Sequence, residues 1–385
     1  MTFEPLPLLA PVADYEQQAA RLLAGHQAGD AAVLDFFHHH HPRFLDDTVR
    51  WLPKRIPGSE IRATALSVDD AQLTLARGYS YLDWPALVSH VAGIRQANSA
   101  IQQFELAAEA VITGDIAALT ALLATVADLT QARSARVTCH EPAGHRATLL
   151  HYLGANGVEG YRQKSPSNAV EVATLLLKGG ALVDALAGMY GGQHTTMDML
   201  VSSTPPAEAG VQIDLINTLL DHGAAIEGTG SRQWGSPLMT ALVFGFPAAA
   251  AALAGRGARV ETIDAAAGLG RLNDVVRLLT GADAGARHRA IALAAQLGHS
   301  AVVEVLLDAG EDPDRYNPSG LHDHSTPLHQ AAGEGHHEVV RLLVSRGARL
   351  DIADKLWQGT PLGWARFGGH QAMADYLVAH GARDS

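Results

Sequence analysis

A recurring glycine constrains the fold of this chain more than any other feature of the sequence. It stands four residues after the first member of an apolar pair, in loose variants of the pattern LLxxGA. The set comprises Gly180, Gly223, Gly257, Gly310, Gly347 and Gly381, at intervals of 43, 34, 53, 37 and 34 residues. Periods of this length are typical of solenoids, in which each repeat buries its apolar face against its neighbours.

Both ends of the repeating unit have a physical explanation. Glycine ends a helix in the left-handed conformation without the steric cost that a side chain imposes. Threonine can cap a first helical turn and proline is tolerated in it, so Thr-Pro pairs mark helix starts. The pattern predicts an all-α solenoid of helix-turn-helix units with hairpin loops. We expect eight units, at about residues 104–135, 148–185, 196–227, 236–260, 263–283, 288–313, 326–350 and 360–382.

Two C-terminal units carry a specific family resemblance. Residues 326–332 read TPLHQAA, and GHHEVVRLL follows at 335–343. This unit resembles a nearly complete ankyrin consensus repeat. The next unit, at 360–382, is similar but has Gly363 where the motif has histidine. The resemblance extends over about residues 104–383 and weakens upstream; it implies a binding surface made of a concave groove and hairpin fingers.

Residues 1–100 lie outside this register, and we expect them to form a helical module before an array at 101–385. Helical periodicity persists there, notably in residues 68–94. That segment resembles an N-terminal helical module found before ankyrin arrays in bacterial proteins, through ARGY at 76–79 and WPAL at 84–87. We therefore expect an ankyrin-repeat protein of bacterial type whose helical N-terminal region could cap the first repeat.

Composition limits the classes of core and partner. Apolar residues make up 47% of the chain but aromatic residues only 5%, so the core must consist mostly of Ala, Leu and Val. The net charge is −12, from 28 basic and 40 acidic residues. Proteins that neutralise nucleic-acid phosphates normally show a basic excess, so we expect no binding to nucleic acid.

The sequence also indicates a compartment. The single cysteine, Cys139, can form no intrachain disulfide, which favours a reducing environment. The N-terminus lacks the basic and apolar regions of a signal peptide, and no apolar stretch reaches ~18 residues. We expect a soluble cytoplasmic monomer that does not bind membranes. No cofactor is expected, since Gly268-Leu269-Gly270 lacks the preceding strand of a dinucleotide fingerprint.

The largest departure from a plain repeat is an insertion within the second unit. It spans residues 157–168 and holds Glu159, Tyr161, Arg162, Gln163 and Lys164. A loop that projects a guanidinium and an ammonium can bind a carboxylate or a phosphate. Long loops inside compact arrays are often functional, so we predict a ligand site here. A solvated insertion without function is the alternative.

A second candidate is the finger before the third unit. Gly191 and Gly192 permit a sharp turn there, so we expect Gln193, His194 and Thr195 to lie near the fingertip. In a stack this finger lies beside the second unit, where His151, His194, Tyr190 and Tyr161 could converge and supply a general acid or base. If the chain is an enzyme, the catalytic candidates are His151, Tyr161, Arg162 and His194.

Two further fingers carry candidate contact residues. Residues 316–325 include His322 and His324, but a His-x-His pair without a third and fourth ligand predicts no metal site. We place both histidines among the ligand-binding candidates. Trp234 and Trp357 lie just before helix starts, where a tryptophan can anchor a partner. Packing of one finger against the next is the alternative for both.

The sequence leaves two functions open. The first is a binding module that recognises a protein or other ligand on its concave groove and fingers. The second is an enzyme or small-molecule-binding protein with its site in the polar insertions of repeats two to four. The absence of a recognised catalytic motif favours the first, and the clustering of polar insertions favours the second. A closed pocket of at least ~300 Å³ lined by those residues would support the second.

Overall fold

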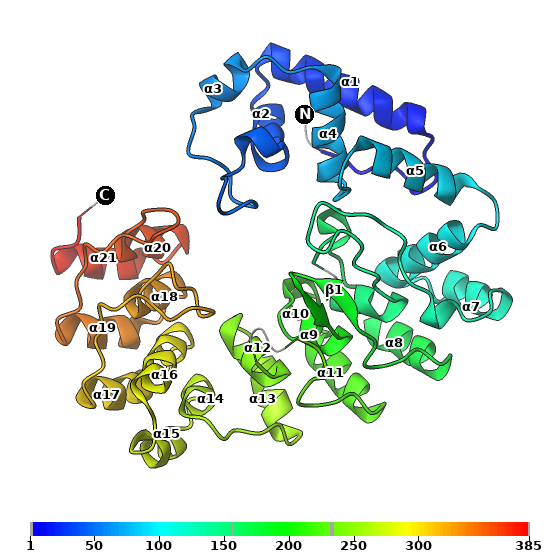
Figure 1. Ribbon diagram of the computed structural model, residues 1–385. Coiled ribbons are helices and arrows are strands. Elements are labelled where there is room, and N and C mark those ends of the chain that lie inside the picture. The colour runs from blue at the N-terminus through cyan, green and yellow to red at the C-terminus, as the bar shows by residue number, and fades with distance from the viewer. Residues whose placement is uncertain (1–2, 156, 232–234, 384–385) are drawn as a thin grey trace. The chain divides into compact units, whose positions relative to one another are not determined.

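The computed structural model describes residues 3–155, 157–231 and 235–383 and is almost entirely helical. It contains two compact units (Figure 1). Unit 1 comprises Met1–Ala225 with Thr229–Ser231, and unit 2 comprises Ile226–Gly228 with Arg232–Ser385. Within the described ranges, no helix is long and apolar enough to cross a membrane. These findings confirm the expected all-α ankyrin-type solenoid.

Unit 1 opens with a helical region that has its own core. Its elements are α1 (Val12–Ala28), α2 (Ala31–His40), η1 (Pro42–Phe44), α3 (Gly58–Ala63), α4 (Val68–Gly78) and α5 (Trp84–Arg95). Sequence signals set the ends of α4 and α5: Ser67 forms a reciprocal capping box with Asp70, and the Asp83 carboxylate accepts a hydrogen bond from the amide of Ala86. Tyr15, Phe37 and Leu75 belong to the core beneath them.

The rest of unit 1 holds the first three expected repeats. Its elements are α6 (Ala100–Thr113), α7 (Ile116–Thr125), η2 (Leu129–Gln131), η3 (Leu149–Gly154), η4 (Gly160–Arg162), α8 (Ala169–Lys178), β1 (Ala187–Met189), β2 (Gly192–His194), α9 (Thr196–Leu200), α10 (Thr204–Glu208) and α11 (Gln212–Asp221). Contacts pair α6 with α7, η3 with α8 and α9 with α11. Helix α5 packs on α6, so the N-terminal helices adjoin the first repeat.

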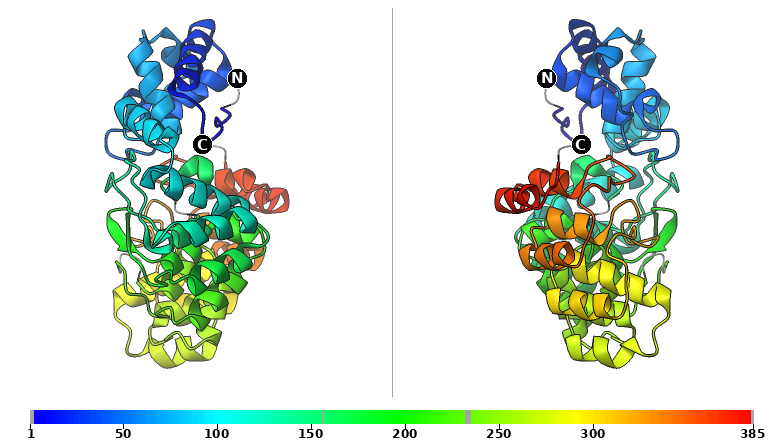
Figure 2. Two further views of the ribbon diagram at one scale, coloured as in Figure 1. Left: turned by 90° about the vertical axis from the view of Figure 1, so that its right-hand side faces the viewer. Right: turned by 90° about the vertical axis from the view of Figure 1, so that its left-hand side faces the viewer.

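Unit 2 is a regular stack of helix pairs. Its elements are α12 (Pro237–Val243), α13 (Pro247–Gly255), α14 (Ile263–Gly268), α15 (Leu272–Leu279), α16 (Ala284–Gln296), α17 (Ser300–Asp308), α18 (Pro327–Gly333), α19 (His337–Ser345), α20 (Pro361–Phe367) and α21 (Gln371–Ala379). Each first helix packs on the second of its pair and on the first helix of a neighbouring pair. Figure 2 shows the yellow, orange and red pairs in this order from two sides.

The repeat signals act as expected in the structure. The marker glycines all adopt positive φ, between 87° and 102°. At Gly347 this conformation ends α19 and lets the amide of Ala348 donate to the carbonyl of Leu343 (3.0 Å). One continuous core, made mostly of Ala, Val and Leu side chains, runs from Ile263 to Ala382. The small-residue core predicted from composition is therefore confirmed in unit 2.

Candidate functional site

The insertion of the second repeat folds into unit 1 instead of projecting from it. The amide of Gly160 donates to Ser80 Oγ (3.1 Å), which ties the insertion to the segment after α4. The side chains of Glu159 and Arg162 are 0% and 4% exposed, whereas Lys164 is exposed. The prediction that this loop projects its charged groups is therefore wrong for Glu159 and Arg162, because partners of opposite charge hold both side chains in the interior of unit 1.

Those partners form a square of two carboxylates and two guanidiniums. Arg162 Nη1 lies 2.7 Å from Glu105 Oε2 and 3.0 Å from Glu159 Oε2. Arg136 lies 3.4 Å from each carboxylate, through Nη2 to Glu105 and through Nε to Glu159. The four formal charges cancel, which is the condition under which charged groups can be buried.

Further side chains satisfy the outer carboxylate oxygens. Glu105 Oε1 lies 3.0 Å from His90 Nε2, and Glu159 Oε1 accepts a hydrogen bond from Tyr152 Oη (2.7 Å). Burial by itself would raise the pKa of both carboxyl groups, but the charges of Arg136 and Arg162 outweigh it. The pKa of each carboxyl group is therefore held below its usual range, and both stay ionised.

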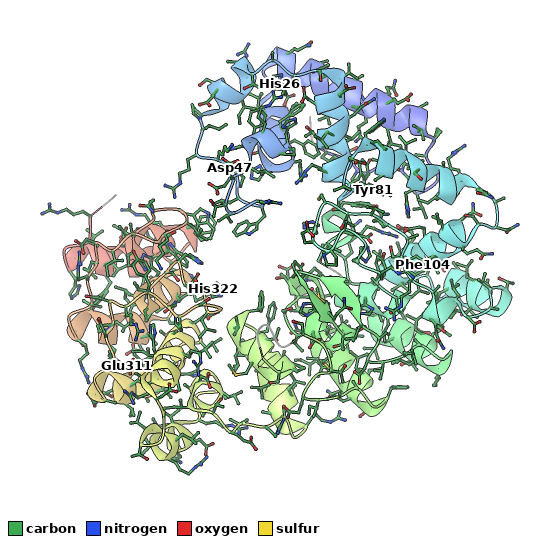
Figure 3. All side chains as sticks on the ribbon, viewed as in Figure 1. His26, Asp47, Tyr81, Phe104, Glu311 and His322 are labelled. Atoms are coloured by element: carbon green, nitrogen blue, oxygen red, sulfur yellow. The ribbon has the colours of Figure 1, made fainter. Side chains whose placement is uncertain are left out.

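Tyrosine rings pack against Arg136 beside a cavity that Arg136 and Arg162 also line. The guanidinium carbon of Arg136 lies 4.5 Å from the ring centre of Tyr81 and 5.6 Å from that of Tyr161. Tyr161 in turn packs edge-on against Tyr79, with ring centres 5.3 Å apart. Figure 3 labels Tyr81 after α4 and Phe104 on α6, two elements that supply this region.

The cavity has a volume of about 320 Å³ and lies wholly within unit 1. Polar or charged side chains in its lining are Tyr15, Tyr79, Tyr81, Glu109, Arg136, Tyr161, Arg162 and Lys164, and apolar ones come from residues 5–8, Ile94 and Ile112. Tyr161, Arg162 and Lys164 of the insertion all line this cavity, while His151 and His194, which we expected to converge with Tyr161, are not part of the lining.

His151 makes the bonds of a structural histidine. Its Nδ1 accepts from the amide (3.2 Å) and hydroxyl (2.8 Å) of Thr148, so Nε2 carries the proton and donates to the carbonyl of His194 (3.2 Å). Burial lowers the pKa of His151 to about 4. His329 makes the same bonds to Thr326 and to the carbonyl of Gly359. Both ring nitrogens of His151 are therefore engaged in hydrogen bonds that belong to the repeat structure.

The finger before the third repeat is a short β-hairpin. Gln193 pairs with Gly188 across β1 and β2, and the turn falls at Tyr190-Gly191, where both residues have positive φ. Gln193 is exposed, as expected, and Tyr190 is exposed as well. His194 and Thr195 are buried instead, and the Thr195 hydroxyl caps α9 in a reciprocal box with Asp198. The expected turn at Gly191-Gly192 is thus shifted by one residue.

In unit 2, two neighbouring fingers form an aromatic and charged surface. Trp357 is 50% exposed, and its ring centre lies 5.1 Å from that of His324. Lys355 Nζ lies 4.3 Å from the ring centre of Tyr316 and donates to the carbonyl of Asp323 (2.9 Å). We call residues 316–324 and 353–358 the finger surface. Trp234 lies outside the residues that the structure describes.

His322 and His324 serve different neighbours on this surface. His322 Nε2 lies 3.1 Å from the carbonyl of Val243 at the end of α12, and Figure 3 labels this residue. His324 packs on Trp357 and Trp364, and burial lowers its pKa. Among the described side chains, no group of three His, Cys, Asp or Glu residues is arranged to hold a metal ion.

Comparisons with known proteins agree with this geometry. Residues 262–354 and 291–384 match the family described as ankyrin repeats in three copies. The mouse cyclin-dependent kinase 4 inhibitor B is 36% identical over 118 residues, which cover 30% of this chain and 88% of that protein. The chain belongs to the ankyrin-repeat family.

Other relatives show how far this likeness extends. The human kinase 4 inhibitor B is 36% identical over 121 residues, 30% of this chain and 85% of that protein. The rat protein of that name is 37% identical over 83 residues, 22% of this chain, and the match spans only 61% of its length. These ankyrin proteins come from animals, so they lend no support to a bacterial type.

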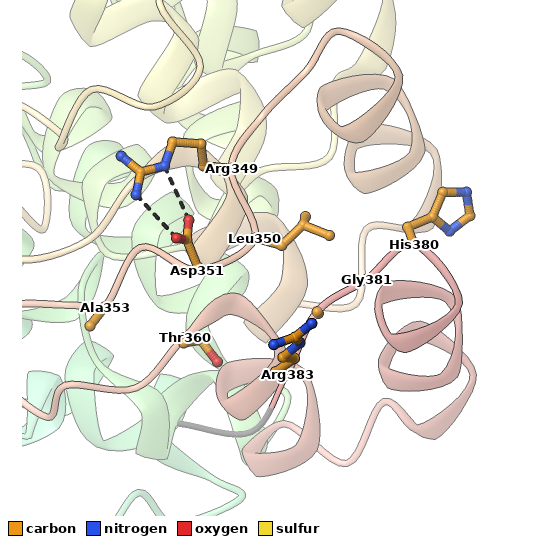
Figure 4. Close-up of a pocket in the computed structure, with 9 residues that line it drawn as sticks. Arg349, Leu350, Asp351, Ala353, Thr360, His380, Gly381 and Arg383 are labelled. Carbon is orange, nitrogen blue, oxygen red and sulfur yellow. Dashed lines mark hydrogen bonds and ion pairs between the residues drawn. The ribbon is translucent and has the colours of Figure 1, made fainter.

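A second hollow lies beside the last ankyrin finger. It measures about 620 Å³ and is lined by Arg349, Leu350, Asp351, Ala353, Thr360, His380, Gly381, Ala382 and Arg383 (Figure 4). The carboxylate of Asp351 lies 3.1 Å from the guanidinium of Arg349, and both side chains are largely exposed. Exposed pairs of this kind contribute little binding energy.

The sequence-based predictions included Glu159 and Arg162 but not Glu105 and Arg136, the other two members of the buried square of charges. Glu105 carried a usable signal, because it lies on the apolar stripe of α6 between Phe104 and Ala108. A carboxylate on a buried helix face requires a partner. Arg136 carried no such signal, since it lies in an irregular segment outside the ankyrin register.

Proposed function

We propose that unit 2 is a protein-recognition module that uses its finger surface and the adjoining concave groove. The carrying observation is Trp357, which is half-exposed on a finger and whose ring contacts that of His324. A solvent-exposed tryptophan supported by a neighbouring ring is the kind of residue that anchors protein interfaces.

The relatives support recognition of a protein. The curated names of the mouse and human relatives describe inhibitors of a kinase, which implies action on another protein. The finger surface has a suitable chemistry, since it combines aromatic rings with Lys355 and Asp323 near the backbone of the next finger. Interfaces of this type join an aromatic centre to a polar rim.

We further infer a cytoplasmic monomer that binds neither nucleic acid nor membrane and requires no cofactor. The net charge of −12 and the single cysteine support this assignment. The competing prediction of an enzyme at His151, Tyr161, Arg162 and His194 has less support. His151 is engaged in repeat geometry, and Arg162 is held by two carboxylates.

The test compares proteins retained from a lysate of the source cells by immobilised chain variants. We expect one protein to be retained by the unaltered chain and by Trp51→Ala, an exposed tryptophan of unit 1. Trp357→Ala should weaken that retention by about thirtyfold, because anchor residues contribute about 2 kcal/mol or more. Equal retention by Trp357→Ala at unchanged thermal stability would refute the finger surface as the site.

A further inference from the structure

We propose that the cavity in unit 1 binds a small carboxylate with an apolar tail. This site is separate in sequence from the finger surface and goes beyond protein recognition. Its volume of about 320 Å³ lies at the small end of ligand pockets, which measure about 300–1,000 Å³. Its lining combines two buried cations, Arg136 and Arg162, two opposed charges, Glu109 and Lys164, and an apolar wall.

Of the two buried cations, Arg162 is the one on which we place the ligand carboxylate. Its Nη1 donates to both Glu105 and Glu159, but within the described chain its Nη2 is buried without a hydrogen-bond partner. Nη2 makes an ion pair with Glu109 Oε2, at 3.5 Å. A buried donor that lacks a hydrogen bond is costly, and a ligand oxygen at this position would remove that cost.

The same square of charges fixes the conformation of the Arg162 side chain before a ligand binds. Its guanidinium lies 5.2 Å from the ring centre of Tyr152, and its other edge is fixed by two carboxylates. The side chain therefore loses little conformational freedom when a ligand binds. A fixed guanidinium favours planar carboxylates, whose oxygens match its geometry.

Two charges of opposite sign in the cavity lining should have opposite effects on binding. Lys164 is exposed and adds a positive charge next to Arg162 in the insertion. Glu109 is 47% exposed and occupies the space near Nη2. A ligand carboxylate would replace the weak contact of Glu109, so Lys164 should assist binding and Glu109 should oppose it.

The remaining wall suits an apolar tail. It consists of Leu6, Leu8, Ile94 and Ile112 together with tyrosine rings. The N-terminal part of the wall is fixed, because the amide of Leu6 donates to Tyr79 Oη (2.7 Å). A ligand with one carboxylate and an apolar body would therefore satisfy Arg162 and bury its tail at the same time.

The experiment titrates the full chain by calorimetry with propionate, octanoate and 3-phenylpropionate, and with 3-phenylpropanamide and phenyl phosphate as comparisons. We expect a longer carboxylate to bind and the uncharged amide to bind about tenfold more weakly or not at all. Lys164→Gln should weaken carboxylate binding about fivefold, and Glu109→Gln should strengthen it by a similar factor. Lys164 is exposed and Glu109 is half-exposed, so neither variant should disturb folding.

Lys178→Gln is the matched control, since Lys178 is exposed and lies outside the cavity lining. It should leave binding unchanged. The proposal is overturned if no carboxylate binds to either the unaltered chain or Glu109→Gln, or if amide and carboxylate bind equally. It is also overturned if phenyl phosphate binds more tightly than every carboxylate. Loss of partner retention through Trp357→Ala tests the finger surface alone, so the two proposals can fail separately.

Discussion

At the residue scale, two histidines of different repeats show how a local motif fixes a side chain. His151 and His329 each accept from a threonine three residues earlier and donate to a finger carbonyl. Burial lowers the pKa of both imidazoles to about 4. Each ring therefore stays neutral in the folded chain and couples a repeat to the next finger.

His329 should make folding sensitive to acid. Its folded pKa of about 4 lies below the ordinary value of 6.5, so the unfolded chain binds the proton first as the pH falls. The stability due to neutral His329 is complete above about pH 6.5 and is lost progressively between about pH 6.5 and pH 4. His329→Asn should cost about 1–3 kcal/mol near pH 7, and this cost should shrink by about 2 kcal/mol near pH 5.

Urea denaturation of the unaltered chain and of His329→Asn, near pH 7 and near pH 5, measures this change in the free energy of unfolding. His337→Asn alters an exposed histidine at the start of α19 and serves as the control. A cost of His329→Asn that is the same near pH 7 and near pH 5 would contradict the assignment of a neutral, buried ring.

At the element scale, the helix start of each repeat depends on the same few residues. In α18, Thr326 and His329 cap each other, whereas α20 has Gly363 at the equivalent position. An added Cβ at Gly363 would meet only Thr360 Oγ1, at 4.0 Å. The backbone of the last repeat therefore accepts a Cβ at the position of the missing histidine.

Restoring the motif should stabilise unit 2. Gly363→Ala should contribute about 1 kcal/mol, because glycine is unfavourable inside a helix. Gly363→His should retain part of that gain and add about 0.5–1.5 kcal/mol through hydrogen bonds with Thr360. Thermal and urea unfolding of the three chains give the two increments. A histidine variant less stable than the original chain would show that the ring needs a following finger to pack against.

The insertion at residues 157–168 shows how contacts with residues distant in the sequence can bury a polar segment. As a local sequence it is polar and has the composition of a solvated loop, yet η4 lies against the segment after α4. Its charges are neutralised by Glu105 on α6 and by Arg136. Removing one member of such a buried set leaves an uncompensated charge, which is far more costly than losing an exposed ion pair.

At the scale of the whole molecule, the chain has separate cores. One lies among the N-terminal helices of unit 1, and another extends through the ankyrin repeats of unit 2. In a repeat array each repeat contacts only its neighbours, so the loss of stability caused by a local defect should extend to adjacent repeats and decrease with distance. Unit 1 and unit 2 should accordingly have separate stabilities against unfolding.

Leu343→Ala tests this independence. Leu343 is 0% exposed in α19, and its truncation should cost about 2–5 kcal/mol. We expect faster amide hydrogen exchange in α16–α21 and unchanged exchange in α4–α6 of unit 1. Mass spectrometry of exchanged peptides reads out both regions. A uniform increase along the chain would show instead that the two units unfold together.

The sequence by itself determined the repeat architecture, because the signals that carry it are local. Left-handed glycines, Thr-Pro helix starts and the Thr326–His329 pair act within a few residues, so they can be read along the chain. Only the tertiary structure decided the place of Arg162, since its partner Glu105 lies 57 positions away. Burial of a charge depends on which distant charges surround it, and no local pattern encodes that arrangement.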